Sequence, residues 1–131
     1  MAEFRPRVYW EDRLANATGL QGVGYLGLGQ DFNAWMYRVR RSVFLEVVQR
    51  HVPDIPGKAI LDVGSGTGFY LDRWAELRAT RVGGSDITQV ATDKLSAEYP
   101  GVPVHRMDIS DPALSISGPF DVISCMDVLF H

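Results

Sequence analysis

The chain has 131 residues, of which 46% are hydrophobic and 22% charged, and a domain of this size buries about two-thirds of its unfolded surface. That is enough for one core and too little for two domains. The formal net charge of -3, with both signs scattered along the chain, argues against a dedicated nucleic-acid surface. No apolar run is long enough to cross a membrane, and the N-terminus lacks the apolar core of a signal peptide, which predicts a cytoplasmic protein.

The first 57 residues predict a helical and loop cover rather than a separate domain. A short helix is expected over residues 8–15, and five glycines between positions 19 and 29 predict a loop, because glycine disfavours regular elements. Asp31 is a candidate N-cap for a long amphipathic helix that ends near His51. Its apolar residues recur at the helical period and are expected to pack in the core: Phe32, Trp35, Met36, Val39, Val43, Phe44 and Val47.

Residues 58–131 alternate short apolar runs with helical periodicity. The pattern predicts, in order, a strand at 59–63, a helix at 69–79, a strand at 80–85, a helix at 88–99, and strands at 103–107 and 120–125. Leu71, Trp74 and Ala75 are expected on the buried face of the first helix, and Thr88 is expected to cap the second. Alternating strands and helices imply right-handed crossovers and a parallel sheet. We therefore predict a doubly wound, Rossmann-like α/β fold.

The most informative segment is Asp62-Val63-Gly64-Ser65-Gly66-Thr67-Gly68, which lies where a buried strand turns into a helix. Glycines allow a tight turn there, and the start of the helix offers free amide groups to a nucleotide-like ligand. A ligand-free turn could have the same sequence. A dinucleotide-binding fingerprint requires a small residue at position 69, where this chain has the large Phe69. A P-loop requires a lysine directly after its last glycine, and no lysine follows Gly66 or Gly68.

Two further acids follow predicted strands. Asp86 ends the second strand, where a carboxylate can accept the ribose hydroxyl protons, although a helix-start acid before Thr88 fits as well. Asp108 ends the predicted third strand and is a weaker candidate for ligand binding than Asp86, because an ordinary turn aspartate would explain it equally well. His51 and His105 lie far apart with no ligand spacing, so we expect no metal site.

The acid followed by G-x-G-x-G resembles motif I of class I S-adenosylmethionine-dependent methyltransferases, and the later motifs of residues 59–131 fall in that family's order. The resemblance implies these residues for binding S-adenosylmethionine or S-adenosylhomocysteine: Asp62, Gly64, Ser65, Gly66, Gly68, Asp86, Ile87, Asp108, Ile109, Cys125 and Met126. The glycine loop would line the methionine and ribose portions. Asp62 would brace the loop amides and favour the ammonium group, and Asp86 would hold the ribose.

The remaining implied residues would surround the adenine and the methionine arm. Ile87 and Ile109 would sandwich the ring and Asp108 would read its amino group. Cys125 and Met126 would approach the arm, although the apolar surroundings of Cys125 fit a small core residue equally. The N-terminal cover is further expected to lie over the cofactor and neutralise its carboxylate, through Tyr25 or Tyr37 together with Arg38.

The implied activity is in-line transfer of a methyl group from a sulfonium to an oxygen, nitrogen or carbon nucleophile, in which alignment supplies most of the catalysis. The resemblance identifies no catalytic residue; His131 is a candidate facing the substrate, and an ordinary loop histidine is the simpler interpretation. The absence of a basic stripe favours a small-molecule acceptor. Two alternatives stay open: a noncatalytic S-adenosylmethionine-binding module, and a nucleotide-dependent oxidoreductase, which Phe69 opposes.

In the family, three more strands and their helices follow the fourth strand. The resemblance therefore predicts that this chain carries only the cofactor-binding half and has little turnover by itself. It also predicts a bare fourth strand, with no lysine or proline in residues 122–126 to protect it. We expect that edge to cause self-association, for example as a two-fold homodimer.

Overall fold

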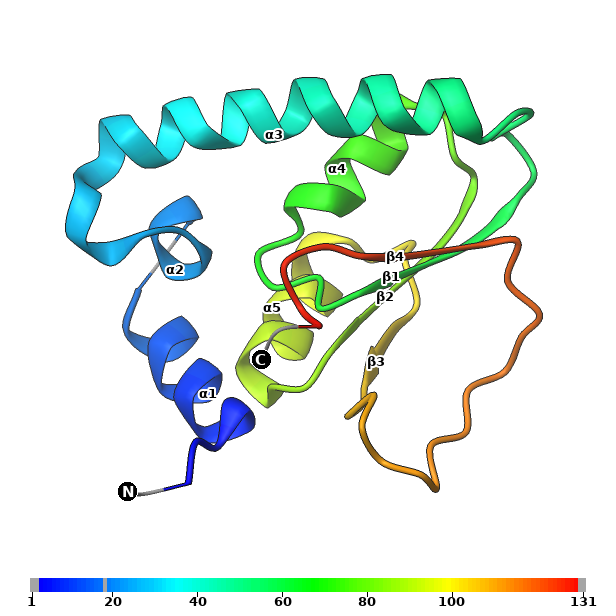
Figure 1. The fold of residues 1–131 in the computed structure, drawn as a ribbon. Helices are drawn as coiled ribbons and strands as arrows, with labels where there is room; N and C mark the ends of the chain where they lie inside the picture. The colour runs from blue at the N-terminus through cyan, green and yellow to red at the C-terminus, as the bar shows by residue number, and fades with distance from the viewer. Residues whose placement is uncertain (1–2, 18, 130–131) are drawn as a thin grey trace.

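A computed structural model describes residues 3–17 and 19–129, and the elements follow the predicted order (Figure 1). The N-terminal part contains α1 (Pro6–Asn16), α2 (Leu20–Val23), the 3-10 helix η1 (Leu26–Leu28) and α3 (Gly29–His51). The remainder contains β1 (Ala59–Val63), α4 (Phe69–Glu76), β2 (Arg81–Asp86), α5 (Gln89–Glu98), β3 (Val104–Arg106) and β4 (Val122–Cys125). The prediction of four strands and two intervening helices is confirmed, with bounds that differ by a few residues.

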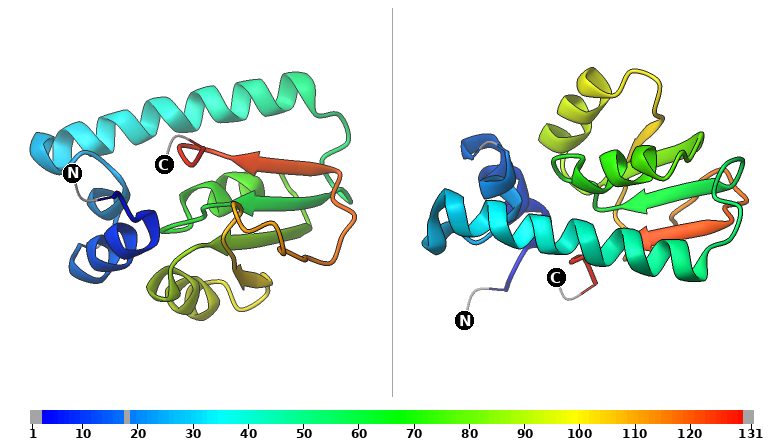
Figure 2. Two further views of the ribbon diagram at one scale, coloured as in Figure 1. Left: turned by 60° about the horizontal axis from the view of Figure 1, so that its bottom comes forward. Right: turned by 90° about the horizontal axis from the view of Figure 1, so that it is seen from above.

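The four strands form one parallel sheet in the order β3-β2-β1-β4. The chain moves outward from β1 to β2 and β3 and then returns to the other side of β1 for β4. This reversal places a topological switch point between β1 and β4, and ligands of open α/β sheets bind at the carboxyl ends of strands at such a point. In Figure 2, α1 and α2 lie beyond that edge of the sheet.

The main core lies between α3, α4 and the sheet. Its buried members are Phe44, Val48, Ile55, Ile60 and Trp74. Trp74 is 1% exposed and meets Phe44 edge to face, with ring centroids 5.2 Å apart. Such a pair adds about 0.5–1.5 kcal/mol beyond the area that it buries. Because Phe44 belongs to α3, the N-terminal cover shares this core with the strand-rich part of the chain.

The predicted packing face of α3 is wrong. Of the seven apolar residues expected in the core only Phe44 is buried, whereas five are between 37% and 54% exposed: Phe32, Trp35, Val39, Val43 and Val47. The buried face instead holds Asn33, Tyr37, Phe44 and Val48. Asn33 is drawn inward because its amide accepts from the Tyr25 N–H at 2.7 Å and donates to the Tyr25 and Gly29 carbonyls. Hydrogen bonds from a polar residue therefore set the rotation of the helix.

Three smaller expectations also differ. Asp31 is not the N-cap of α3, which begins two residues earlier and lacks a side-chain cap. The glycine-rich stretch is not a plain loop, because α2 and η1 form within it. Helix α4 ends at Glu76, before Arg78 adopts a left-handed φ of 62°, and Ala75 is exposed.

The cap of α5 is confirmed, since the Thr88 side chain accepts from the Ala91 N–H. Over residues 3–17 and 19–129, no helix combines the length and apolarity needed to cross a membrane.

Candidate functional site

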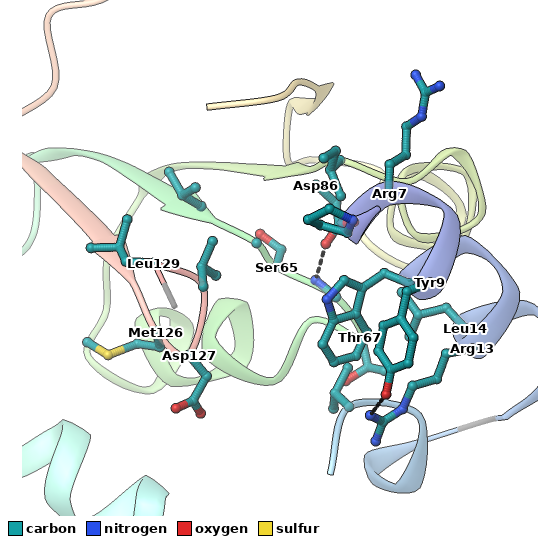
Figure 3. A pocket seen from close by; sticks show the side chains of 18 of the residues that line it. Arg7, Tyr9, Arg13, Leu14, Ser65, Thr67, Asp86, Met126, Asp127 and Leu129 are labelled. Carbon is teal, nitrogen blue, oxygen red and sulfur yellow. Dashed lines mark hydrogen bonds between the residues drawn. The ribbon is translucent and has the colours of Figure 1, made fainter. Parts of the chain in front are cut away.

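A cavity of about 900 Å³ opens at the carboxyl ends of β1 and β4. Its floor comes from the segments that follow the strands: residues 63–67, 85–87, 107–110 and 126–129. Its other walls come from residues 3–10, 13, 14 and 23–25, from Met36, Tyr37 and Arg40 of α3, and from Phe69 and Tyr70 of α4. In Figure 3, Ser65 and Thr67 lie between α1 side chains on one side and Met126, Asp127 and Leu129 on the other.

The glycine loop after β1 depends on glycine at three positions. Gly64, Gly66 and Gly68 have φ of 72°, 54° and 85°, a left-handed region that disfavours other residues. Each also lies against another segment: a Cβ on Gly64 would overlap Val128, one on Gly66 would lie 3.0 Å from Val23, and one on Gly68 would lie 2.5 Å from the Tyr99 hydroxyl. The loop therefore lets three distant segments close around it.

Asp86 pins this loop to the end of β2. Its Oδ2 accepts from the Gly66 N–H at 3.0 Å, and its Oδ1 accepts from the N–H and the hydroxyl of Thr88 at 3.0 and 2.7 Å. The residue is 7% exposed and lines the cavity. A carboxylate has about four acceptor positions, so roughly one remains for a ligand. Asp86 thus shapes the loop as well as being available to a hydroxyl group.

Asp62 differs from its expected role. Its carboxylate is not what braces the loop amides, since the Gly66 amide bonds to Asp86 and the Ser65 amide to the Ser85 carbonyl at 2.8 Å. Asp62 is 1% exposed and lies beneath the loop, outside the cavity lining. Burial raises the pKa of its carboxyl group to about 6, and the hydrogen bond from the Ser124 hydroxyl partly opposes that rise.

The other residues implied by the resemblance divide into two groups. Gly64, Ser65, Gly66, Asp86, Ile87, Asp108, Ile109 and Met126 line the cavity together, whereas Asp62, Gly68 and Cys125 do not. Asp108 is exposed, and its Oδ1 accepts from the N–H and the hydroxyl of Ser110 at 2.9 and 2.6 Å. These bonds hold the pKa of its carboxyl group below the usual value, so Asp108 closes a turn at the edge of the cavity.

The cover also differs from its expected composition. Tyr25 and Tyr37 line the cavity, but Arg38 does not. Arg40 lies there instead, paired with Asp127 and 5.0 Å from the centroid of the Tyr37 ring. Two residues farther along α3 than Arg38, it lies on the helix face that meets the cavity.

Helix α1 supplies a wall that the sequence reading missed. Its cavity residues include Tyr9, Trp10 and Arg13, and the Arg13 guanidinium lies 4.9 Å from the Trp10 ring centroid. Helix α1 contacts the start of α5 through Glu11, whose carboxylate accepts hydrogen bonds from the backbone N–H groups of Gln89 and Val90 at 2.8 Å each. The only sequence signal was the density of aromatic and arginine residues at positions 4–13. His131 lies outside the described residues.

The chain is similar in sequence and in fold to known methyltransferases. A family model described as "Methyltransferase domain" matches residues 60–131, which is more than half of the chain. The chain belongs to the class I S-adenosylmethionine-dependent methyltransferase family. The segments that form the cavity floor fall within the matched region of this methyltransferase domain, whereas α1 to α3 precede it.

Individual relatives agree with that assignment. The chain is 34% identical over 91 residues to a ubiquinone biosynthesis O-methyltransferase of Chromobacterium violaceum, covering 66% of this chain and 38% of the relative. It is 33% identical over 84 residues to a tRNA U34 carboxymethyltransferase of Colwellia psychrerythraea, covering 62% of this chain and 26% of the relative. The chain therefore spans well under half the length of these curated relatives.

The fold is similar to that of a solved methyltransferase. Magnesium protoporphyrin IX methyltransferase from Synechocystis PCC 6803, with bound SAM, superposes with a TM-score of 0.66 at 21% identity, covering 95% of this chain and 61% of that one. The Rossmann-like arrangement predicted from the sequence is confirmed.

Proposed function

We propose that the cavity binds S-adenosylmethionine and that the protein transfers its methyl group to an acceptor. The observation that carries the proposal is the placement of Asp86, a buried carboxylate that is fixed against the glycine loop at the switch point and faces the cavity. The cavity volume of about 900 Å³ lies in the range of small-molecule and cofactor sites. A cosubstrate with ribose hydroxyls and a cationic arm fits the acidic groups at these strand ends.

In the proposed complex, Asp86 accepts from one ribose hydroxyl with its remaining acceptor position, and the cavity face of the glycine loop lies along the methionine arm. Ile87 and Ile109 offer apolar contacts to the adenine. S-adenosylmethionine supplies an electrophilic methyl group on a sulfonium. The task of the protein is to align the acceptor with that group and to exclude water, because the departing sulfide needs no proton.

We further propose a small organic acceptor that enters between the loop and the α1 wall. That wall holds the rings of Tyr9 and Trp10, which favour stacking of a planar molecule, and Arg13 supports it by donating to the Tyr9 hydroxyl and the Gly24 carbonyl. The names of the relatives include both a small-molecule and a tRNA acceptor, so radiolabelled methyl transfer should be assayed with small phenolic acceptors and with tRNA. Saturable binding of the cofactor without transfer to any acceptor would favour the noncatalytic module.

Amide chemical shifts test where the cofactor binds. Addition of S-adenosylhomocysteine should move the amide signals of Gly66 and Ile87, which line the cavity. The signals of Gly57 and Gly101, which lie outside it, serve as matched controls and should stay. Shifts confined to residues outside the cavity would contradict the proposed site.

A two-fold homodimer through β4 is a separate proposal. Among the described residues β4 pairs only with β1, and Ile123 is 62% exposed on it. An apolar strand with free backbone groups on one edge favours pairing with a second copy. Light scattering at micromolar concentration should give twice the monomer mass, and Ile123→Lys should restore the monomer; a wild-type monomer would contradict the proposal.

A further inference from the structure

Three buried side chains from three elements form one directional series of hydrogen bonds beneath the glycine loop. The Trp74 Nε1–H of α4 donates to the Ser124 Oγ of β4 at 3.2 Å, and the Ser124 hydroxyl donates to the Asp62 Oδ1 of β1 at 2.6 Å. Indole N–H can only donate, so it occupies the serine oxygen as an acceptor and leaves the single hydroxyl proton for the carboxylate. The three residues are 1%, 4% and 1% exposed.

The other carboxylate oxygen of Asp62 is unsatisfied. Asp62 Oδ2 is buried and has no hydrogen-bond partner among the residues that the structure describes. An orphaned buried acceptor costs free energy and calls for an explanation. The strand continues from Asp62 directly into Val63 and Gly64, both of which line the cavity, so Asp62 immediately precedes the cavity lining.

We propose that Ser124 is a positioning residue: with Trp74 it keeps Asp62 ionised and fixed behind the glycine loop, where the negative charge favours the ammonium-bearing arm of the cofactor. The inference rests on the proposed function. It gives the orphaned carboxylate oxygen a role, since a buried charge is tolerated where a ligand of opposite charge compensates it. This role also gives a reason for the polar Ser124 in β4, an otherwise apolar strand, where its side chain meets Trp74 of α4.

The groups around Asp62 favour its neutral form, so the hydrogen bond from the Ser124 hydroxyl is important for keeping the carboxylate ionised. Asp86 of β2 raises the pKa of Asp62 by charge repulsion, although burial is the larger cause. Burial is the main cause of the raised pKa values of Cys125 of β4 and Tyr70 of α4, and the Asp62 charge adds a smaller rise to both. No cation among the described residues contributes to the pKa of Asp62, so the Ser124 bond is the main influence that favours the ionised form.

The test compares two ligands over a range of pH. S-adenosylhomocysteine carries the charged arm, whereas 5′-methylthioadenosine has the same nucleoside without it. In the wild type, affinity for S-adenosylhomocysteine should fall as the pH drops below about 6. In Ser124→Ala the midpoint should move up by about one pH unit, which makes binding about tenfold weaker on the acidic side. Binding of methylthioadenosine should change little.

Controls separate positioning from simple structural support. Ser124→Thr retains a hydroxyl and should restore the wild-type midpoint, and Asp62→Asn should lower affinity for S-adenosylhomocysteine and abolish its pH dependence. An equal loss for both ligands at every pH in Ser124→Ala would overturn this inference while leaving the proposed function standing. If the wild type binds neither ligand at any pH, the proposed function fails, and this inference fails with it. Should Ser124→Ala not fold, the comparison between Asp62→Asn and the wild type decides, and equal pH profiles overturn the inference.

Discussion

Replacement of Asp86 by asparagine tests the residue on which both the loop and the cofactor site depend. The carboxylate accepts three hydrogen bonds, from the Gly66 amide and from two donors of Thr88. Asparagine replaces one of its oxygens with a second donor, which must then face an N–H or O–H group. Leaving such a buried group unpaired costs about 1–3 kcal/mol, so we expect the free energy of unfolding to fall by that amount.

The loss of binding should exceed what destabilisation alone produces. A hydrogen bond to a charged group contributes about 1.5–3 kcal/mol, so calorimetry should show roughly 10- to 150-fold weaker binding of S-adenosylhomocysteine at a temperature where both proteins are folded. Thr88→Val is the matched control: it removes the hydroxyl bond to Asp86 and the cap of α5. It should cost about 1 kcal/mol of stability and leave affinity within a few-fold of the wild type. Unchanged affinity in Asp86→Asn would refute the reasoning.

Three further predictions follow from the fold and the loop. Gly66→Ala should lower the free energy of unfolding in urea by about 1–2 kcal/mol because φ of Gly66 is 54°. Adding Val23→Ala should not restore that free energy, since the cost comes from the backbone conformation and not from the 3.0 Å contact with Val23. Full restoration in the double variant would contradict this reason. Folding raises the pKa of Asp62 from 3.8 to about 6, so the folded state binds more protons than the unfolded state between these pH values. The free energy of unfolding of the wild type, relative to that of Asp62→Asn, should therefore rise as the pH falls through 6, by at most about 1.4 kcal/mol per pH unit. A difference between the two proteins that is constant from pH 5 to 7 would count against this prediction. Trp35→Ser should change the unfolding free energy by less than about 0.5 kcal/mol, whereas Phe44→Ala should cost about 3–5 kcal/mol, and similar costs for the two would be inconsistent with the observed face of α3.

The strands and the loop were predictable because their signals are local. A short apolar run such as residues 59–63 and glycines at positions that require positive φ leave few alternative conformations. The order of the acids after each strand also carried information, because carboxyl ends of parallel strands meet at one edge. Asp86 lies in the cavity lining at the end of β2, its role in binding a cofactor stays a prediction, and the parallel sheet was inferred without any contact information.

The rotation of α3 could not be predicted from its own residues. Its apolar stripe is at helical spacing, yet the buried face is selected by Asn33, whose partners Tyr25 and Gly29 lie in the glycine-rich stretch, where the sequence predicts a loop and no side-chain contacts. The same limit applies to Asp62 and Ser124, which are 62 positions apart and meet only because β4 pairs with β1. Side-chain hydrogen bonds between distant segments leave no periodic trace in the sequence.

Calorimetric titration of the 131-residue chain with S-adenosylhomocysteine at pH 7.5 measures whether the cavity binds the cofactor. We expect saturable binding at one site per chain, competition by S-adenosylmethionine and no competition by NAD. A folded chain that gives no binding signal with S-adenosylhomocysteine at millimolar concentration, or that binds NAD in its place, would contradict it.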